Sequence, residues 1–287
     1  TPENMITIAR RAEELGYHSL WTFQRLLFPA DHAMAPVYRS VQDPIVTLAY
    51  LAGVTSRIRL GVAVLNMPFF SPALLAKQLA TLQAVSGGRL DAGLGLGWLP
   101  EEFAASGVPL EHRGRRSEEY LRVLRALWSE GITEHEGEFY RVPPAHLDPK
   151  PAPPPPIILG GTAEPALRRA GRLADGWVSS SRVDLATIGQ QIYTVKEAAR
   201  EAGRDPDSLR FIVRGVTRPG RAGDPGRKPL TGSYEEIRAD VARLAEQGVT
   251  EVFHDLNFHP EIGSPDADAV ESMRRAEEAL EALRPEA

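Results

Sequence analysis

The stretch IRLGVAVLNMPFFSPALLAKQLATLQAVSGGRLDAGLGLGW, residues 58–98, decides the fold of this chain. It predicts an apolar strand over 58–64, an amphipathic helix over 71–85 and a second apolar strand over 90–96. This order of strand, helix and strand favours a parallel sheet. Apart from Arg59 and Asp91 near their starts, both strands are apolar on both faces, as strands covered by helices require. Parallel sheets bind ligands at the carboxyl ends of their strands, so we expect the functional site where these two strands end.

The same alternation continues along the chain and predicts an α/β fold. We expect strands over 18–23, 58–64, 90–96, 157–159, 176–179, 209–216 and 251–256. We expect helices over 3–15, 43–54, 71–85, 116–129, 163–173, 184–202, 233–247 and 266–284. About seven strands and eight helices are one strand short of a (β/α)8 TIM-type barrel. Because the chain opens on a helix, we expect the first barrel strand to be absent from this sequence, which would leave two strand edges unpaired.

The composition is that of an ordinary globular protein. Hydrophobic residues make up 43% of the 287 residues and charged residues 25%. The chain has no cysteine, which excludes a disulfide framework, a thiolate nucleophile and iron–sulfur ligation. No apolar run approaches the ~18 residues of a membrane span, and no secretory signal opens the chain. The net charge of −5 gives no reason to propose nucleic acid, and we expect a cytoplasmic protein.

Two segments interrupt the alternation. The run PKPAPPPP, 149–156, is either a linker between domains or a stiff polyproline approach to the strand at 157. Because the alternation continues unchanged beyond it, we expect one domain over 1–287. The polar segment 131–150 predicts a hairpin over the site, with Phe139, Tyr140 and His146 available to substrate or to a cofactor tail. The alternative is an edge hairpin that packs on a partner subunit.

Five motifs, in order, carry a family resemblance. They are LAKQLATL (75–82), SGGRL (86–90), GLGLGW (93–98) with Glu101 and Glu102 after it, IILGGTAEPALRRAGRLADGW (157–177) and GVTEVFHDLNF (248–258). In this set the chain resembles the luciferase-like monooxygenase superfamily, in its branch that depends on the deazaflavin coenzyme F420. The resemblance spans nearly the whole chain. Relatives have a strand before the first helix and usually a longer loop near 31–39, so we expect residues to be missing at both places.

The resemblance implies a function and partners. We expect an oxidoreductase that transfers a hydride between F420 and a small organic substrate, and that assembles as a homodimer. One alternative is an FMNH2-dependent two-component monooxygenase, which uses FMN as its flavin and needs a flavin reductase as partner. Another is a flavin-binding barrel without catalysis.

Three glycines precede Trp98 at one strand end. The spacing of a dinucleotide-binding loop fails there, because its third glycine would fall on Trp98. The resemblance implies that Gly95 and Gly97 let a flat cofactor ring lie against backbone that has no side chains. The alternative is a strand packed closely inside a barrel, with Trp98 in the core.

The neighbouring strand end, Val62 to Pro68, carries a second expectation from the resemblance. Similar proteins have a non-proline cis peptide there that supports the cofactor ring, and its position in this chain is near Ala63–Val64. Asn66 is the polar exception in the run and is placed to hydrogen-bond the ring edge. The alternative is a plain buried strand.

Gly160, Gly161 and Thr162 lie between a strand and a helix. Free N–H groups at a helix start make an anion site, and the resemblance implies the cofactor phosphate there. Thr162 can cap the helix or bond a phosphate oxygen. The alternative is a tight turn with a cap, which Glu164 favours because a carboxylate in the first turn competes with an anion. Arg168 and Arg169 are available to screen Glu164 or to meet an anionic tail.

Three further residues are candidates for catalysis. Gln24 and Arg25 stand where relatives place an acid–His or Glu–Arg pair, but arginine is a poor proton donor. Arg25 is suited to stabilise an anionic substrate or reduced cofactor, or else it pairs with a carboxylate such as Asp31 or Asp43. His254, at the last strand end, has an ordinary pKa near neutrality and is a candidate acid or base. The alternative for His254 is packing or hydrogen bonding.

Two other classes of site find little support. The seven histidines form no recognised ligand motif, so we expect no metal. A phosphosugar isomerase or aldolase would use the same barrel and a Gly-Gly phosphate loop, with a base or a Schiff-base lysine at a strand end. Lys77 and Lys196 fall on predicted helices and Lys150 in the polar segment, which argues against an aldolase.

Overall fold

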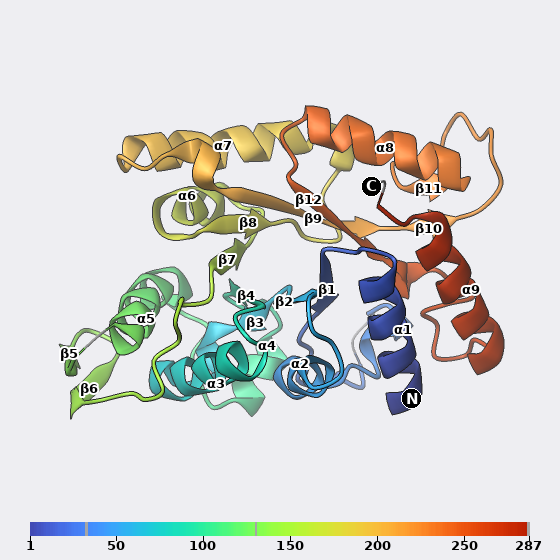
Figure 1. The fold of residues 1–287 in the computed structure, drawn as a ribbon. Coiled ribbons are helices and arrows are strands. Elements are labelled where there is room, and N and C mark those ends of the chain that lie inside the picture. Colours follow the sequence, from blue (N-terminus) through green and yellow to red (C-terminus); the bar gives the residue numbers. More distant parts are fainter. Residues whose placement is uncertain (32–33, 130, 286–287) are drawn as a thin grey trace.

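Seven parallel strands form the wall of a nearly closed barrel in the computed structural model, which describes residues 1–31, 34–129 and 131–285 (Figure 1). In spatial order they are β1 (Ser19–Thr22), β2 (Arg59–Val62), β4 (Leu90–Gly95), β7 (Ile157–Gly160), β8 (Gly176–Val178), β9 (Arg210–Val216) and β12 (Glu251–Asp255). The short β3 (Leu65–Asn66) also pairs with β4. Each predicted strand is present to within two residues, and the α/β barrel fold is confirmed.

Helices follow the strands around the barrel (Figure 1). They are α1 (Pro2–Glu14), α2 (Pro44–Ala52), α3 (Pro72–Val85), α4 (Pro100–Ala105), α5 (Arg113–Trp128), α6 (Glu164–Leu173), α7 (Ile188–Glu201), α8 (Tyr234–Glu246) and α9 (Ala269–Ala282). Single 3-10 turns are η1 (Pro36–Tyr38), η2 (Met67–Phe69), η3 (Leu185–Thr187), η4 (Pro206–Ser208) and η5 (Leu256–Phe258). The eight predicted helices are all present, and α4 is an addition that begins two residues after Trp98. Several helix starts follow from side-chain caps, as at Asp43, Ser71 and Ser233. No helix in the described ranges is long and apolar enough to cross a membrane.

The strands β1 and β12 stand at the two ends of the sheet, and side chains rather than a backbone ladder join them. Trp21 stacks on Phe253, with ring centroids 5.1 Å apart. The Trp21 Nε1–H group donates to Glu251 at 3.0 Å, and the Ser19 hydroxyl donates to the same carboxylate at 2.5 Å. The edges expected from the strand count are therefore covered by aromatic and polar contacts.

The barrel interior is filled in layers below the carboxyl end. A charged layer lies near the strand starts, where Asp91 is fully buried. It accepts hydrogen bonds from Arg59 at 2.7 Å and from Arg210 at 2.5 Å, and Arg210 also bonds Glu251 at 2.6 Å. Each buried charge is thus paired, as burial requires. Because alternate residues of a strand share a face, the aromatic and aliphatic residues two positions further on form the next layer.

The predicted hairpin is present, but it does not lie over the site. The strands β5 (Thr133–Glu136) and β6 (Arg141–Ala145) pair antiparallel beside α5 (Figure 1). Glu119 of α5 accepts hydrogen bonds from the N–H groups of Phe139 and Tyr140, and Tyr140 packs edge-on against Tyr120. His146 is exposed. The hairpin therefore belongs to the outer ring of the barrel, which corrects the expectation that its residues reach substrate or cofactor.

The Pro-rich stretch leads from the hairpin strand β6 into the barrel strand β7. β7 pairs directly with β4. The bonds Asp148–Pro149 and Ala152–Pro153 are cis. The stretch is therefore not a continuous polyproline II segment, contrary to the expectation, because that helix is built from trans bonds. The short pair β10 (Arg218–Pro219) and β11 (Thr231–Gly232) belongs to the loop between β9 and α8.

Candidate active site

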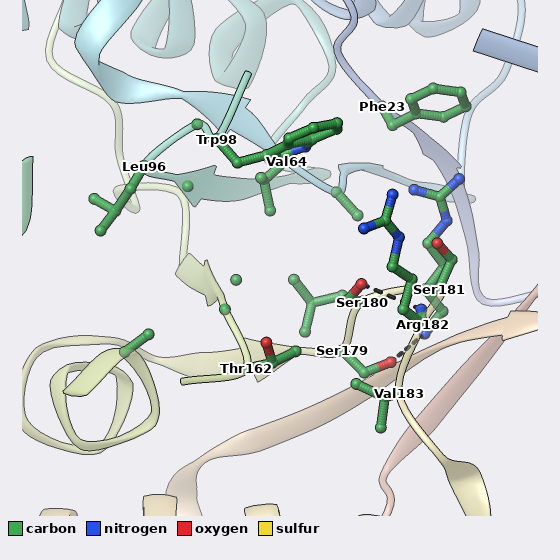
Figure 2. A pocket seen from close by; sticks show the side chains of 18 of the residues that line it. Phe23, Val64, Leu96, Trp98, Thr162, Ser179, Ser180, Ser181, Arg182 and Val183 are labelled. Atoms are coloured by element: carbon green, nitrogen blue, oxygen red, sulfur yellow. Dashed lines mark hydrogen bonds between the residues drawn. The ribbon is translucent and has the colours of Figure 1, made fainter. Parts of the chain in front are cut away.

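A cavity of about 620 Å³ opens at the carboxyl ends of the barrel strands (Figure 2). This is the size of a pocket that holds a drug-sized molecule. Eleven of the twelve residues predicted for the site line it: Gln24, Arg25, Ala63, Val64, Asn66, Gly95, Gly97, Trp98, Gly160, Gly161 and Thr162. Figure 2 shows Val64 and Trp98 on one side of the cavity, with Thr162 and Ser179 across from them. Five strand ends that are far apart in sequence thus meet at one hollow.

The cavity floor is built around Val64. The peptide bond Ala63–Val64 is cis, as the resemblance led us to expect, and it lies between β2 and β3. A Cβ atom at Gly95 would overlap the Val64 side chain, and one at Gly160 would lie 3.0 Å from it. The two glycines therefore admit Val64, which presents an apolar surface to the cavity. Gly95 thus serves close packing in the barrel as well as lining the site.

Trp98 forms an exposed wall of the cavity. Gly97 before it has a left-handed backbone, with φ of 71°, and a Cβ atom there would lie 2.9 Å from the Phe103 ring. Trp98 is 45% exposed, which corrects the alternative that it belongs to the core. The guanidinium groups of Arg25 and Arg182 lie 5.3 and 5.5 Å from its ring centre.

Arg25 is held by a buried carboxylate. Its Nη1 lies 2.9 Å from Oε2 of Glu102, and the two side chains are 7% and 1% exposed. The other carboxylate oxygen of Glu102 accepts the N–H of Leu26 at 2.7 Å. The partner is thus Glu102, from the residues that follow GLGLGW, and not Asp31 or Asp43. The pair holds the guanidinium of Arg25 in place at the cavity wall, next to Trp98.

Gln24 holds the backbone of Asn66, the other polar residue predicted at the strand ends. Its Oε1 accepts the backbone N–H of Asn66 at 2.8 Å, and both residues are buried. Gln24 therefore ties β1 to the backbone that follows the cis bond. This contact gives Gln24 a positioning role and leaves the Asn66 side chain on the cavity surface.

The Gly-Gly-Thr turn lies at the opposite end of the cavity. Gly161 has φ of 138°, a conformation open to glycine. The N-cap of α6 is Ala163, which has no side-chain oxygen, so Thr162 does not cap the helix. Glu164, in the first turn of α6, is exposed.

The two arginines of α6 are engaged elsewhere, which corrects their proposed roles at the site. Arg168 pairs with Glu201, and Arg169 lies 3.4 Å from Glu118. Neither is among the described residues that line the cavity.

The sequence reasoning missed the segment after β8. Residues 179–184, SSSRVD, line the cavity, together with Phe23, Tyr38, Arg113, Gln191 and Arg214. Oε1 of Gln191 is buried without a hydrogen-bond partner in the described ranges. The rule that ligands bind at the carboxyl ends of all strands points to this segment, because SSSR directly follows the strand predicted at 176–179.

His254 does not reach the cavity. Along β12, Phe253 and Asp255 face the barrel interior, so His254 between them points outward. Its Nδ1 forms a hydrogen bond of 2.9 Å with the Thr217 hydroxyl, whose oxygen also lies 2.9 Å from the Gly215 carbonyl oxygen. Burial lowers its pKa to about 4. The expectation of an acid or base catalyst is therefore replaced by a partly buried histidine that is neutral near pH 7 and has a structural role.

Comparison with known proteins places this geometry in a family. The family model described as luciferase-like monooxygenase matches residues 1–221. An uncharacterised protein of Mycobacterium tuberculosis is 32% identical over 283 residues, which cover 94% of this chain and 90% of that protein. The FMNH2-dependent dimethylsulfone monooxygenase of Pseudomonas putida is 34% identical over 201 residues, which cover 68% of this chain and 53% of that protein.

Solved structures share the fold. The monooxygenase RslO1 from Streptomyces bottropensis superposes with a TM-score of 0.81 at 24% identity, over 98% of this chain and 92% of that one. The coenzyme F420-dependent tetrahydromethanopterin reductase from Methanopyrus kandleri superposes with a TM-score of 0.76 at 18% identity, over 100% and 94% of the two chains. Because the family model matches most of this chain, the chain belongs to the luciferase-like monooxygenase family.

Proposed function

We propose that the protein is an oxidoreductase that binds coenzyme F420 in the 620 Å³ cavity and transfers a hydride to or from a small organic substrate. The observation that carries the proposal is the convergence of the strand-end residues on one cavity, with Val64 and its cis bond as floor. When bound, the deazaflavin supplies a ring carbon that exchanges hydride. Residues of the chain bind and orient the cofactor and stabilise charge.

The cavity surface fits a flat ring with an anionic tail. Val64, Gly95 and Asn66 line the cavity with an apolar, a small and a polar group that suit the ring. Across the cavity, the uncapped start of α6 and the hydroxyl of Ser180 suit an anionic group. The buried Oε1 of Gln191 lacks a partner within the described chain, as expected of a group that meets a ligand.

The charged residues of the wall have an electrostatic role in this proposal. Glu102 holds Arg25 at the cavity, where its charge stabilises negative charge on reduced cofactor or substrate. Arginine does not give up its proton near neutral pH, so Arg25 orients and stabilises but does not transfer protons. Trp98 is available to cover the ring or substrate from the mouth.

A second candidate is an FMNH2-dependent two-component monooxygenase supplied by a flavin reductase. The match to the Pseudomonas putida enzyme favours it. Oxygen activation needs a cavity shielded from water, whereas hydride transfer between carbons does not. The exposure of Trp98 at the mouth therefore favours the F420 reaction. A barrel that binds cofactor without turnover is the remaining alternative.

Titration with F420 and with FMN, each oxidised and reduced, tests the proposal through the fluorescence or absorbance change of each cofactor. We expect micromolar binding of F420 and much weaker binding of FMN. Preference for reduced FMN would replace the proposal with the monooxygenase. Failure to bind either cofactor would reject both. We also expect a homodimer, and sedimentation velocity at micromolar concentration would measure it.

A further inference from the structure

A second hollow adjoins the cofactor cavity. It has a volume of about 660 Å³ and shares part of its wall with the first, including Tyr38, Arg182 and Arg214. Its other walls come from Met34 and Ala35, from η5 and from the loop between β9 and α8. A molecule in the second hollow would therefore lie against one in the first.

The second hollow is strongly cationic. Arg182, Arg214, Arg218 and Lys228 line it, and Asp184 is the single carboxylate among its described lining residues. Asp184 accepts the N–H of Ala186 at the start of η3. Within the described chain, neither Arg218 nor Lys228 has an acidic side chain within 4 Å of its charge. Such an excess of unpaired cations favours an anionic ligand.

Arg214 offers the second hollow a guanidinium group that is held in place by its neighbours. Its side chain is 10% exposed, and its Nε donates to Asp255 at 2.6 Å. The guanidinium lies over the rings of Phe23 and Phe258, 4.6 and 5.8 Å from their centres. Its Nη2 is buried without a hydrogen-bond partner in the described ranges. A buried guanidinium N–H needs an acceptor, and a ligand carboxylate in the hollow would supply one.

Apolar side chains line the same hollow. Met34, Val183, Val216 and Phe258 contribute to its wall. A small inorganic anion would leave this surface uncovered, whereas an organic acid with an apolar body would cover it. The lining therefore indicates a ligand with one anionic group and an apolar chain or ring.

We propose that the second hollow is the substrate site and that the substrate is an organic acid, such as a carboxylate with an apolar body. This inference rests on the proposed function, because it takes the first cavity as the cofactor site. The anionic group lies near Arg214, Arg218 and Lys228, and the apolar body extends along the wall shared with the cofactor cavity. The anionic tail of F420 is the other anionic group that would fit the second hollow.

Calorimetric titration with octanoate and with its uncharged analogue octanamide tests the inference. We expect octanoate to bind at least tenfold more tightly than octanamide at low salt, and to weaken as salt screens the charges. The double variant Arg218→Gln/Lys228→Gln should weaken octanoate by about three- to tenfold. Arg221→Gln, an exposed cation of the same loop that does not line the hollow, is the matched control and should bind as the parent does.

The same variants separate the possible outcomes. Equal binding of octanoate and octanamide, or no effect of the double variant on octanoate, overturns the inference. If the double variant binds F420 more weakly but binds FMN and octanoate as the parent does, the hollow holds the cofactor tail. That result overturns the inference as well. Retained octanoate binding without binding of either cofactor would reject the proposed function and leave the acid site standing. Arg214→Gln, checked for folding by circular dichroism, should weaken octanoate further than the double variant does.

Discussion

Trp21 on β1 stacks on Phe253 on β12, with ring centroids 5.1 Å apart and planes 13° apart. The stack joins the two end strands of the sheet, between which the described residues form no backbone ladder. Gly61 makes room for it, because a Cβ atom there would lie 2.5 Å from the Trp21 ring. Ala63 and Val64 pack against the same buried cluster as these two rings, formed by Ile158, Val178 and Ile212. The aromatic pair that closes the barrel therefore shares its packing cluster with the cavity floor.

The substitution Phe253→Ala should destabilise the protein by about 3–4 kcal/mol, because it removes a large partly buried ring and its stacking contact with Trp21. It should also weaken cofactor binding, since Val64 packs against the same buried cluster as the lost ring. Urea unfolding monitored by circular dichroism measures the first effect. Tyr193→Ala is the control, because that ring is 64% exposed and its loss should cost about 0.5 kcal/mol or less. Equal losses in the two variants would show that the stack does not close the barrel.

The substitution Glu102→Gln should destabilise the protein by about 3 kcal/mol, because it leaves the buried charge of Arg25 without its partner. Cofactor affinity should fall in the same variant, since Arg25 is then free to leave the wall. Glu101→Gln changes the exposed neighbour on the same helix and should leave both quantities near those of the parent. Denaturant unfolding and cofactor titration provide the measurements. A stable Glu102→Gln variant with parental affinity would contradict the role given to the pair.

The substitution Gly95→Ala should push the Val64 side chain into the cavity, because the new methyl group overlaps it. We expect cofactor affinity to fall at least ~10-fold and stability to fall by about 1–3 kcal/mol. The double variant Gly95→Ala/Val64→Ala restores the space and should recover most of the affinity. Fluorescence titration of both variants decides the matter. If the double variant binds no better than the single one, the loss has another cause than Val64.

The substitution His254→Asn should leave turnover within about twofold of the parent, because the side chain points away from the cavity and its amide can replace the bond to Thr217. Stability should respond to pH instead. Burial lowers the pKa of His254 from 6.5 to about 4, so the unfolded chain takes up a proton first as the pH falls. The parent should therefore lose stability between pH 6.5 and 4, and the variant should lose less. A large loss of turnover would restore His254 as a catalyst.

How much of the site the sequence could predict depends on the kind of contact involved. The strand ends were predictable, since apolar runs and glycines mark where parallel strands stop, and the cis bond followed from family resemblance. The partner of Arg25 was not, because Glu102 is far along the chain and only the barrel brings the two together. The orientation of His254 was equally hidden. β12 carries bulky or polar residues on both faces, so its alternation does not reveal which face is inside.

The carboxylate of Glu13 anchors the end of α1 to the start of β2. It accepts the N–H groups of Ser56 at 2.9 Å, Arg57 at 2.6 Å and Ile58 at 2.9 Å. Partial burial alone would raise the pKa of Glu13, but the N–H donors outweigh it and lower the pKa from 4.5 to about 2. The folded state therefore binds this proton less readily than the unfolded chain. The resulting stability is present above pH 4.5 and is lost as the pH falls toward 2.

The substitution Glu13→Gln should therefore cost about 1–2 kcal/mol near pH 7, because an amide oxygen is a weaker acceptor than a carboxylate and its NH2 group faces N–H donors. The difference from the parent should shrink as the pH falls from 4.5 toward 2, where the parent carboxylate becomes protonated. Glu14→Gln, at the exposed neighbouring position, breaks a surface pair with Arg11 and should cost about 0.5 kcal/mol or less at any pH. Urea unfolding across this pH range measures both. A pH-independent loss in Glu13→Gln would mean that the side chain acts through its shape and not through its charge.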